Sequence, residues 1–393
     1  MAVGQRSETV RRANLSAIVR ELHANGPRSR SMLVARIGLT RSAIRSLLGE
    51  LLAADLVREE RAALQGTPGR PSPVVRTNPE ALVVLAVEVN VDSLAAAVVG
   101  LGGDVLENVR VERSSGTASV DETITEVVEL SRRLLRDSRR RAALVGVGVA
   151  VAGVVRRSDG FVSMAPNLGW RDVPFGQRLE PALGLDVPVT IANEADLGAL
   201  AEHLRGAAIG HDHVLFVTGE VGVGGGLIVD GRPLSGVAGF GGEIGHLPVN
   251  RSGRQCGCGA IGCWETEVGE AALRRALGLP EGGPRGVVVA ELRALEAALA
   301  AGARTNPLGE FAEWLATGLV TVVNLLAPQL VVLGDLFTAL PPCVVDDVRA
   351  MVHERSLVSR AVGGTRIETS PLGRDAKLVG AAELAFEPVL GAV

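Results

Sequence analysis

The chain has 393 residues, of which 47% are hydrophobic and 21% are charged, and its formal net charge is −4. Its length exceeds that of one typical domain, so we expect two or three domains with a sizeable buried core. No apolar run reaches the roughly 18 residues that a membrane span needs, and no apolar signal core follows the first arginines. These features exclude an obvious membrane partner, and we expect a cytoplasmic protein.

Positive charge is concentrated at the amino terminus. Residues 1–79 contain 13 arginines and six acidic residues, a balance of +7, so the remaining residues carry −11. A basic amino-terminal segment joined to an acidic body is typical of a nucleic-acid-binding head. A solvated, arginine-rich segment is the alternative, and charge alone does not distinguish the two.

The first part of the chain has a helical pattern between residues 11 and 57. After a first helix with one apolar stripe, two shorter helices are predicted at Arg30–Ile37 and Arg41–Asp55, with a tight turn between them. Two helices joined in this way predict a helix-turn-helix. Thr40 is the expected N-cap of the second one, because its hydroxyl can accept a hydrogen bond from a free backbone N–H.

The second helix of this pair is the candidate DNA-reading helix. Its arginines can donate two hydrogen bonds to guanine in the major groove, and its serines are compatible with bases or phosphates. Residues 56–59 and 69–75 predict a hairpin, the wing, whose tip residue Arg70 could enter the minor groove or contact phosphate. The alternative is a three-helix structural module, but the basic charge and the wing together favour DNA binding. The candidate DNA-binding residues are Thr40, Arg41, Ser42, Arg45, Ser46 and Arg70.

The pattern changes at Leu82. Runs such as LVVLAVEV and LAAAVVG predict buried strands, which alternate with helical segments further along the chain. Alternation of buried strands with helices indicates an α/β fold. We therefore divide the chain into a winged helix-turn-helix domain at 1–65, a wing end and linker at 66–80, and an α/β body at 81–393.

A metal-ligand pattern lies in the body at residues 246–263. One histidine and three cysteines fall within 18 residues, and the glycines between them allow tight turns. This Cys₃His set suits tetrahedral zinc, and because it leaves no open position for an activated water, we expect one structural Zn²⁺ per chain. The alternative is three reduced structural cysteines and an unrelated surface histidine. The candidate ligands are His246, Cys256, Cys258 and Cys263.

These motifs resemble those of the ROK family, which groups repressors, uncharacterised reading frames and sugar kinases. Gly-Glu-Ile-Gly-His precedes Cys-x-Cys-x₄-Cys-x-Glu, and the segments Ala165–Trp170, Ile191–Asp196 and Thr218–Gly224 also match, so the resemblance covers nearly the whole chain. The basic head followed by Gly-Arg-Pro resembles the repressor branch. The resemblance implies an actin-like, hexokinase-type body with two α/β lobes and a sugar in the cleft between them.

On the matching motifs, the resemblance also implies which side chains line the sugar. Acids and amides supply fixed donors and acceptors for sugar hydroxyls. His246 would bind zinc through one ring nitrogen and face the sugar with the other, so that the metal orients it. The alternative for Glu243 and Glu265 is that they are ordinary surface carboxylates. The implied sugar-binding residues are Asn167, Asn193, Glu194, Glu243, His246 and Glu265.

The body departs from the family's kinases where phosphate chemistry takes place. Those kinases carry Asp-x-Gly-Gly-Thr-Lys on the first hairpin, whereas residues 88–93 read Glu-Val-Asn-Val-Asp-Ser. Glu194 stands at the position of their catalytic aspartate, and Leu333–Phe337 at that of a Gly-Gly pair near adenosine. One glycine-rich turn, at 221–226, is retained. We expect no catalytic residue and no enzyme activity; the alternative is an ATP-dependent, glucokinase-like sugar kinase with a fused DNA-binding domain.

The combined prediction is a transcriptional regulator of carbohydrate metabolism, with repression as the expected polarity. A sugar or sugar derivative would bind the kinase-like body as effector and change the relative placement of two heads in a homodimer or dimer of dimers. Paired heads predict an inverted-repeat operator in double-stranded DNA. Lys377 is the only lysine of the chain and tyrosine is absent, a composition that indicates a GC-rich genome rather than a functional choice.

Overall fold

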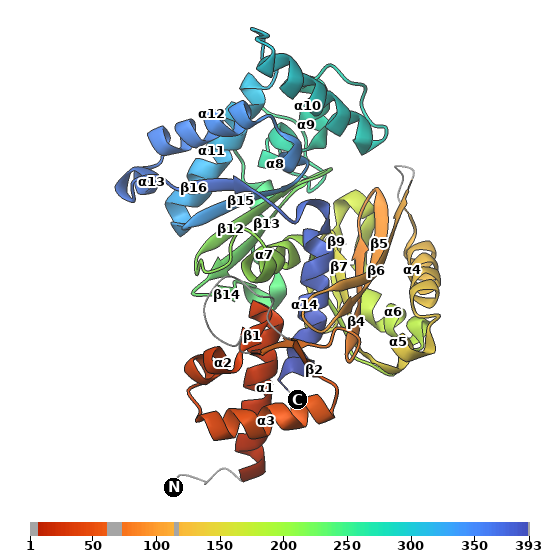
Figure 1. The fold of residues 1–393 in the computed structure, drawn as a ribbon. Helices are drawn as coiled ribbons and strands as arrows, with labels where there is room; N and C mark the ends of the chain where they lie inside the picture. The colour runs from red at the N-terminus through yellow and green to blue at the C-terminus, as the bar shows by residue number, and fades with distance from the viewer. Residues whose placement is uncertain (1–6, 61–72, 114–117, 392–393) are drawn as a thin grey trace.

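The structure is a computed structural model, and it describes residues 7–60, 73–113 and 118–391. A small amino-terminal head is followed by two larger lobes, each built around its own five-stranded sheet (Figure 1). The carboxy-terminal helix runs between the lobes, and its end lies beside the head (Figure 1). The first and last parts of the chain are therefore neighbours in space.

The head is a winged helix-turn-helix. Its core contains Ile18, Leu33 and Ile44, one from each helix, and all three are at most 1% exposed. The predicted N-cap is present, because the Thr40 hydroxyl accepts a hydrogen bond from the backbone N–H of Ala43 at 3.3 Å. The elements of the head are α1 (Ser7–Asn25), β1 (Arg28–Ser29), α2 (Arg30–Ile37), α3 (Arg41–Ala53), β2 (Val57–Glu60) and β3 (Val74–Thr77), with sheet order β1-β3-β2.

Helix α3 ends two residues earlier than the predicted Asp55. Asp55 has a φ of 56°, a left-handed conformation that cannot continue an α-helix. Its carbonyl and its carboxylate each accept a hydrogen bond from the side-chain amide of Asn78 at 2.9 Å. The end of the helix is thereby tied to the segment that leads into the body.

The first lobe is a mixed sheet with strand order β11-β7-β4-β5-β6. Strands β4, β7 and β11 run parallel, and β4, β5 and β6 form antiparallel pairs. Strand β4 is buried on both faces, and a small sheet of order β10-β9-β8 completes the lobe. The elements of this lobe are β4 (Val83–Val89), β5 (Ser93–Gly100), β6 (Val105–Glu112), α4 (Val120–Leu134), α5 (Ser138–Ala142), β7 (Leu144–Val151), β8 (Val154–Arg156), β9 (Phe161–Ala165), β10 (Trp170–Val173), α6 (Phe175–Leu183) and β11 (Val189–Asn193).

The second lobe has a sheet of order β14-β13-β12-β15-β16. Its central strands β12 and β15 are parallel and fully buried, and one large apolar cluster joins the sheet to α8, α11 and α12. The elements of this lobe are β12 (Val214–Gly219), β13 (Val223–Val229), β14 (Arg232–Pro233), α8 (Trp264–Val268), α9 (Glu270–Ala276), α10 (Arg285–Ala300), α11 (Gly309–Leu326), β15 (Leu330–Asp335), α12 (Pro342–Arg355), α13 (Leu357–Ala361) and β16 (Arg366–Thr369).

Two helices lie between the sheets. Helix α14 (Ala376–Leu390) packs on β4 and β7 of the first lobe, and α7 (Glu194–Arg205) packs on β12 and β13 of the second. The two helices also pack on each other, and a Cβ atom added at Gly380 would lie only 1.9 Å from the carbonyl oxygen of Leu197. Glycine is therefore required at this crossing, where the two backbones touch.

The α/β class, the amino-terminal winged helix-turn-helix and the two-lobed body are confirmed. The predicted boundary between residues 65 and 66 lies outside the described residues, so the division into domains stays a prediction. Within the ranges that the structure describes, no helix is both long enough and apolar enough to cross a membrane.

Candidate functional site

A cavity of about 190 Å³ lies between the two lobes. It is bounded by the carboxyl ends of β4, β7 and β11 on one side and by the β12–β13 hairpin on the other. The carboxyl ends of parallel strands are the usual place for a ligand in an α/β protein. The structure brings all six candidate sugar-binding residues to this cavity, which are Asn167, Asn193, Glu194, Glu243, His246 and Glu265.

Asn193 is largely occupied with holding the backbone in place. Its side-chain oxygen Oδ1 accepts hydrogen bonds from the backbone N–H groups of Ala195 at 2.7 Å and Asp196 at 3.2 Å, so Asn193 is the N-cap of α7. Its amide nitrogen donates to the carbonyl of Gly153 at 2.8 Å, which links α7 to the loop after β7. One amide N–H of Asn193 is left for a ligand.

Glu243 and Glu265 flank His246 at the edge of the cavity. The Nε2 atom of His246 lies 3.9 Å from the Glu243 carboxylate, and the Nδ1 atom lies 3.7 Å from the Glu265 carboxylate. Burial raises the pKa of Glu243, and Glu265 adds to this effect, whereas His246 opposes it. A Cβ atom at Gly222 would lie 2.4 Å from Glu265, so this glycine keeps the space beside the carboxylate open.

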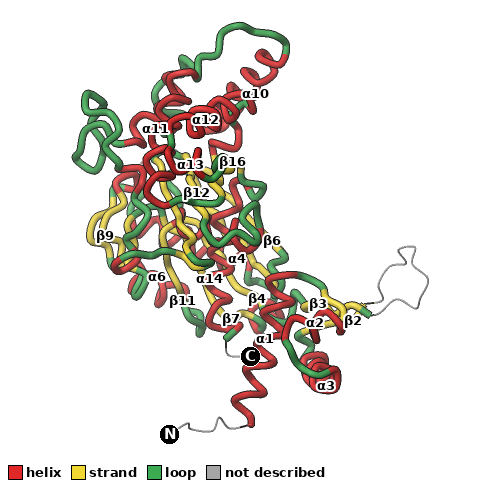
Figure 2. The backbone as a smooth tube through the Cα atoms, turned by 90° about the vertical axis from the view of Figure 1, so that its left-hand side faces the viewer, coloured by secondary structure: helices red, strands yellow, loops and turns green. Residues whose placement is uncertain are grey.

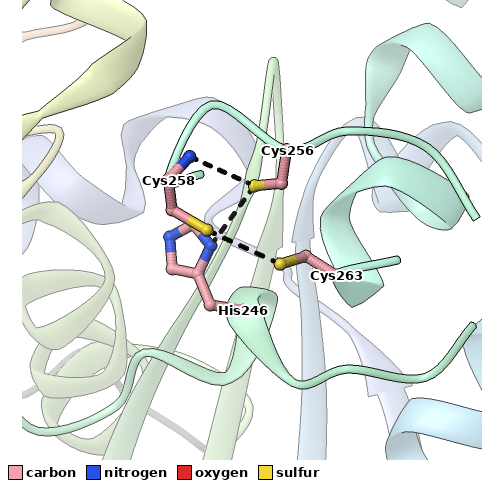
Figure 3. Close-up of side chains that lie close together, drawn as sticks. All are labelled: His246, Cys256, Cys258 and Cys263. Carbon is pink, nitrogen blue, oxygen red and sulfur yellow. Dashed lines mark hydrogen bonds between the residues drawn. The ribbon is translucent and has the colours of Figure 1, made fainter. Parts of the chain in front are cut away.

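The four candidate metal ligands converge (Figure 3). Their ligand atoms all lie within 4.8 Å of one another. The sulfur atoms of Cys258 and Cys263 are 3.7 Å apart, and Cys256 Sγ is 3.6 Å from His246 Nδ1. A tetrahedral zinc with Zn–S and Zn–N bonds of about 2.3 and 2.05 Å would separate two sulfurs by about 3.8 Å and a sulfur from a nitrogen by about 3.6 Å. The cluster could thus bind a metal ion.

Tight turns bring these ligands together. Gly262 directly precedes Cys263 and has a φ of 71°. A Cβ atom at this position would lie 1.5 Å from the carbonyl oxygen of Asn250, so no other residue fits. The Cys256 thiol donates to the Glu265 carboxylate at 2.8 Å. Glu265 therefore borders both the cavity and the metal-ligand cluster, and it joins the two.

Lys377 lies deeper in the cleft and is fully buried. Its ammonium group is 2.6 Å from Glu220, 3.2 Å from Glu194 and 3.4 Å from Asp335, and Glu88 is 3.9 Å away. Genome composition can explain why lysine is rare in this chain but not the position of Lys377, because a lysine is almost never fully buried unless it is paired. The ammonium is the central charge of this cleft.

Burial and the surrounding charges shift the pKa values of several groups in this cluster. Burial raises the pKa of Glu194 to about 8, with Lys377 opposing the shift and neighbouring carboxylates adding to it. The pKa of Asp335 rises to about 7 for the same reasons. Burial lowers the pKa of Lys377, but the four carboxylates raise it more, so the net shift is upward. At neutral pH Lys377 is charged and Glu194 is mostly protonated.

The head presents free cationic side chains on α3. Arg41, Ser42, Arg45 and Ser46 are all exposed, while the opposite face of the helix is buried. Most other arginines of the head are ion-paired, for example Arg30 with Glu59 at 2.5 Å. Within the described part of the chain, Arg41 and Arg45 form no ion pair. The remaining candidate, Arg70, lies outside the described residues.

Two features of the site escaped the sequence analysis. Glu220, Asp335 and Lys377 come from three distant segments, and the only available signal was that the chain has a single lysine. Arg36 at the end of α2 is exposed beside the turn to α3, and it forms no ion pair with a described residue. Its place in a helix-turn-helix was a signal that could have been used.

Comparison with known proteins supports the resemblance. The ROK family model matches residues 84–387. The xylose repressor of Bacillus spizizenii is 28% identical over 385 residues, which cover 98% of this chain and 97% of the repressor. A glucokinase of Streptomyces coelicolor is 30% identical over 326 residues, which cover 78% of this chain and 98% of the glucokinase.

A solved structure extends the likeness to the whole fold. It is described as a ROK family transcriptional regulator and homolog of the E. coli MLC protein, and it aligns with a TM-score of 0.73 and 22% identity. The alignment covers 98% of this chain and 97% of that chain, so it includes the head as well as both lobes. Because the family model alone spans well over half of its residues, the chain belongs to the ROK family.

Proposed function

We propose that this protein is a DNA-binding transcriptional repressor that responds to a sugar. The observation that carries the proposal is that one chain holds a winged helix-turn-helix with unpaired arginines on α3 and a polar cavity between two lobes. The xylose repressor relative matches 98% of this chain, and the glucokinase relative matches 78%. Repressor relatives therefore share the head, which a kinase does not need.

The effector would bind in the cavity between the lobes. Four carboxyl groups, three amides and one imidazole line it, and such a set can donate to and accept from several sugar hydroxyls at once. Glu243 and His246 form one edge, and the free N–H of Asn193 forms another. The sugar contacts of Asn167, Asn193, Glu194, Glu243, His246 and Glu265 belong to this proposal.

The metal-ligand cluster would hold one structural Zn²⁺. Four soft or borderline donors at tetrahedral separations fit this ion, and the closed set leaves no position for a reacting water. The ion would fix the His246 ring through Nδ1 and leave Nε2 directed at Glu243 and the cavity. The role of the ion would be to orient His246, which contacts the effector.

We infer that the body binds the sugar without phosphorylating it. A kinase needs a base for the sugar hydroxyl, and Glu194, with its pKa raised to about 8, is mostly protonated at neutral pH. It also needs positive charge for the nucleotide phosphates. The Lys377 ammonium is fully buried among four carboxyl groups, so it is not free to bind phosphate.

Sugar kinase activity is the second candidate function. Glucokinase relatives at 30% identity and the retained glycine-rich β12–β13 hairpin favour it. The two candidates differ in one property that is simple to measure. ATP is a substrate in the kinase and has no specific role in the sensor.

The DNA partner would be an operator with two inverted half-sites. Each head offers one α3 helix, and a dimer with two-fold symmetry places two such helices against half-sites about one helical turn apart. Residues Thr40, Arg41, Ser42, Arg45 and Ser46 of α3 would face the major groove, and Arg70 of the wing would contact the minor groove or phosphate. The protein would act as a homodimer, or dimer of dimers, in the cytoplasm.

A thermal-shift screen tests this function. Purified protein is heated with a panel of pentoses, hexoses, their N-acetyl and phosphorylated derivatives, and separately with MgATP. The proposal predicts that at least one sugar raises the melting temperature and that MgATP alone does not. Stabilisation by MgATP together with steady ADP release in a coupled assay would favour the kinase instead.

A further inference from the structure

A buried polar cluster joins the head to both lobes. It consists of His23 near the end of α1, Glu383 in α14 and Arg205 at the end of α7. The Nε2 atom of His23 lies 2.9 Å from the Glu383 carboxylate, to which Arg205 Nε also donates at 2.8 Å. Arg205 donates from Nη1 to the backbone carbonyl of His23 at 2.6 Å. Helices from three parts of the molecule therefore meet at one carboxylate.

The hydrogen bonds define the tautomer of His23. Its Nδ1 atom accepts from the backbone N–H of Gly102 at 2.9 Å, so this nitrogen carries no proton. The proton is then on Nε2, which donates to Glu383. The side chains of His23 and Glu383 are only 2% and 4% exposed, and the His23 ring packs on Phe386 with centroids 4.9 Å apart. Every polar atom of the ring has one defined partner.

Apolar packing surrounds this cluster. Ile18 and Leu22 of α1 belong to the same buried cluster as Phe386 and Leu390 of α14. Arg20 donates from Nε to the carbonyl of Leu390 at 3.0 Å. Two perpendicular views show α1 beside the end of α14 (Figure 1, Figure 2). The head therefore packs on the body through a continuous core rather than through a linker alone.

The two body helices that reach the head also begin in the cleft. Glu194 is the first residue of α7 and Lys377 is in the first turn of α14, and the Lys377 ammonium lies 3.2 Å from the Glu194 carboxyl group. Helix α7 packs on the sheet of the second lobe, and α14 packs on the sheet of the first. The contact between Arg205 and Glu383 therefore depends on how one lobe is placed relative to the other.

The geometry makes this contact sensitive to small rotations. The backbones of α7 and α14 touch at Leu197 and Gly380, which serve as a pivot. Arg205 is eight residues beyond Leu197, about 12 Å along the helix at 1.5 Å per residue. A rotation of roughly 10° about the pivot would move Arg205 by about 2 Å, enough to break a hydrogen bond of ordinary length.

We propose that the His23–Arg205–Glu383 cluster is the element that transmits the relative position of the lobes to the DNA-binding head. The inference rests on the proposed function, in which a sugar in the cleft changes DNA affinity. In one lobe arrangement Arg205 bridges Glu383 and His23 and holds the head in place; in the other the bridge is open and the head is free to reorient. A sugar that prefers one arrangement thereby changes the affinity for DNA.

The test compares two substitutions of the same kind in α14. Glu383→Gln removes the negative charge of the cluster and presents an amide N–H group to one of the two donors, His23 or Arg205. Glu387→Gln is the matched control, because Glu387 lies four residues later and its side chain is 71% exposed. Arg205→Lys is a second variant, which keeps the charge but cannot bridge Glu383 and the His23 carbonyl together.

Operator affinity is measured for each full-length variant by fluorescence anisotropy, with D-xylose, D-glucose or the sugar that stabilises the protein most. We expect the wild-type protein and Glu387→Gln to show a sugar-dependent change in DNA Kd within the usual range of about 5–150-fold. Glu383→Gln should reduce this change to less than about twofold, and Arg205→Lys should fall between. The Kd for sugar, measured without DNA, should change little in any variant.

Hydrogen exchange provides a readout that needs no sugar. Amides in the second half of α1 and at residues 100–104 should exchange faster in Glu383→Gln than in Glu387→Gln, because the head has lost its contact. An unaltered sugar response in Glu383→Gln would overturn the coupling role while leaving the proposed function intact. An absent sugar response in the wild-type protein would overturn both, and unchanged exchange in Glu383→Gln would show that the cluster does not hold the head.

Discussion

Replacement of Lys377 by methionine tests the charge arrangement of the cleft. The substitution keeps the length and most of the apolar stem of the side chain but removes an ammonium with three carboxylates within 3.4 Å. Glu220 then retains Arg285 at 3.0 Å, whereas Glu194 and Asp335 have no other ion-pair partner among the described residues. Breaking a buried ion pair by removal of one partner typically costs about 3–5 kcal/mol.

The loss should depend on pH. Without Lys377, the folded-state pKa values of Glu194 and Asp335 rise further above their unfolded values. Groups shifted upward contribute stability below their unfolded pKa and lose it as pH rises through the folded one. We therefore expect Lys377→Met to melt roughly 4–8 °C below the wild-type protein at pH 8, and to lie closer to it at pH 5.

Differential scanning fluorimetry or circular dichroism at both pH values measures the effect. Leu378→Met is the matched control, because Leu378 is the next residue of α14 and is only 4% exposed, and leucine and methionine have similar volumes. A Lys377→Met protein as stable as Leu378→Met at pH 8 would refute this charge arrangement in the cleft. A deficit equal at pH 5 and pH 8 would refute its pH dependence.

Three further predictions concern the metal, the DNA and the sugar. Cys258→Ser should lose zinc by elemental analysis and with it the sugar response, whereas Cys343→Ser, outside the cluster, should retain one zinc per chain. Arg45→Ala should weaken operator binding by about 1–3 kcal/mol and relax the preference at one base pair; Arg139→Ala, an exposed change on α5, should leave the footprint unaltered. Glu243→Ala should abolish the sugar response but keep sugar-free DNA binding, and retention of the response would remove Glu243 from the sugar site.

Sequence reasoning succeeded where the determining residues lie close together along the chain. The helices of the head follow local apolar periodicity, and the Thr40 cap follows from one residue type at a helix start. The four metal ligands fall within 18 residues, so their spacing alone predicted the cluster. The two-lobed body came from the family resemblance, which no local pattern would have supplied.

The charge cluster and the head contact could not be found in this way. Lys377 meets Glu88, Glu194 and Glu220, residues that are 289, 183 and 157 positions away in the sequence. His23 meets Glu383 across 360 positions. Such contacts are set by how two sheets and two helices pack, and a histidine or lysine on a helix face carries no local signal of its partner.

The end of α3 was also predicted imprecisely, because a residue distant in the sequence determines where the helix stops. The apolar pattern continues to Asp55, but the helix stops at Ala53 because Asn78 binds the backbone and side chain of Asp55. Helix ends depend on such contacts as well as on propensity, so a prediction from pattern alone errs by one or two residues.

The account depends most directly on whether sugar binding without ATP changes the affinity for DNA. An operator selected from random duplexes by the purified protein is titrated by fluorescence anisotropy at fixed salt, with and without the sugar that stabilises the protein most, and with no nucleotide present. The account predicts that the sugar changes the operator Kd by at least about fivefold. An operator Kd that the sugar leaves unchanged, in a protein that demonstrably binds that sugar, would contradict it.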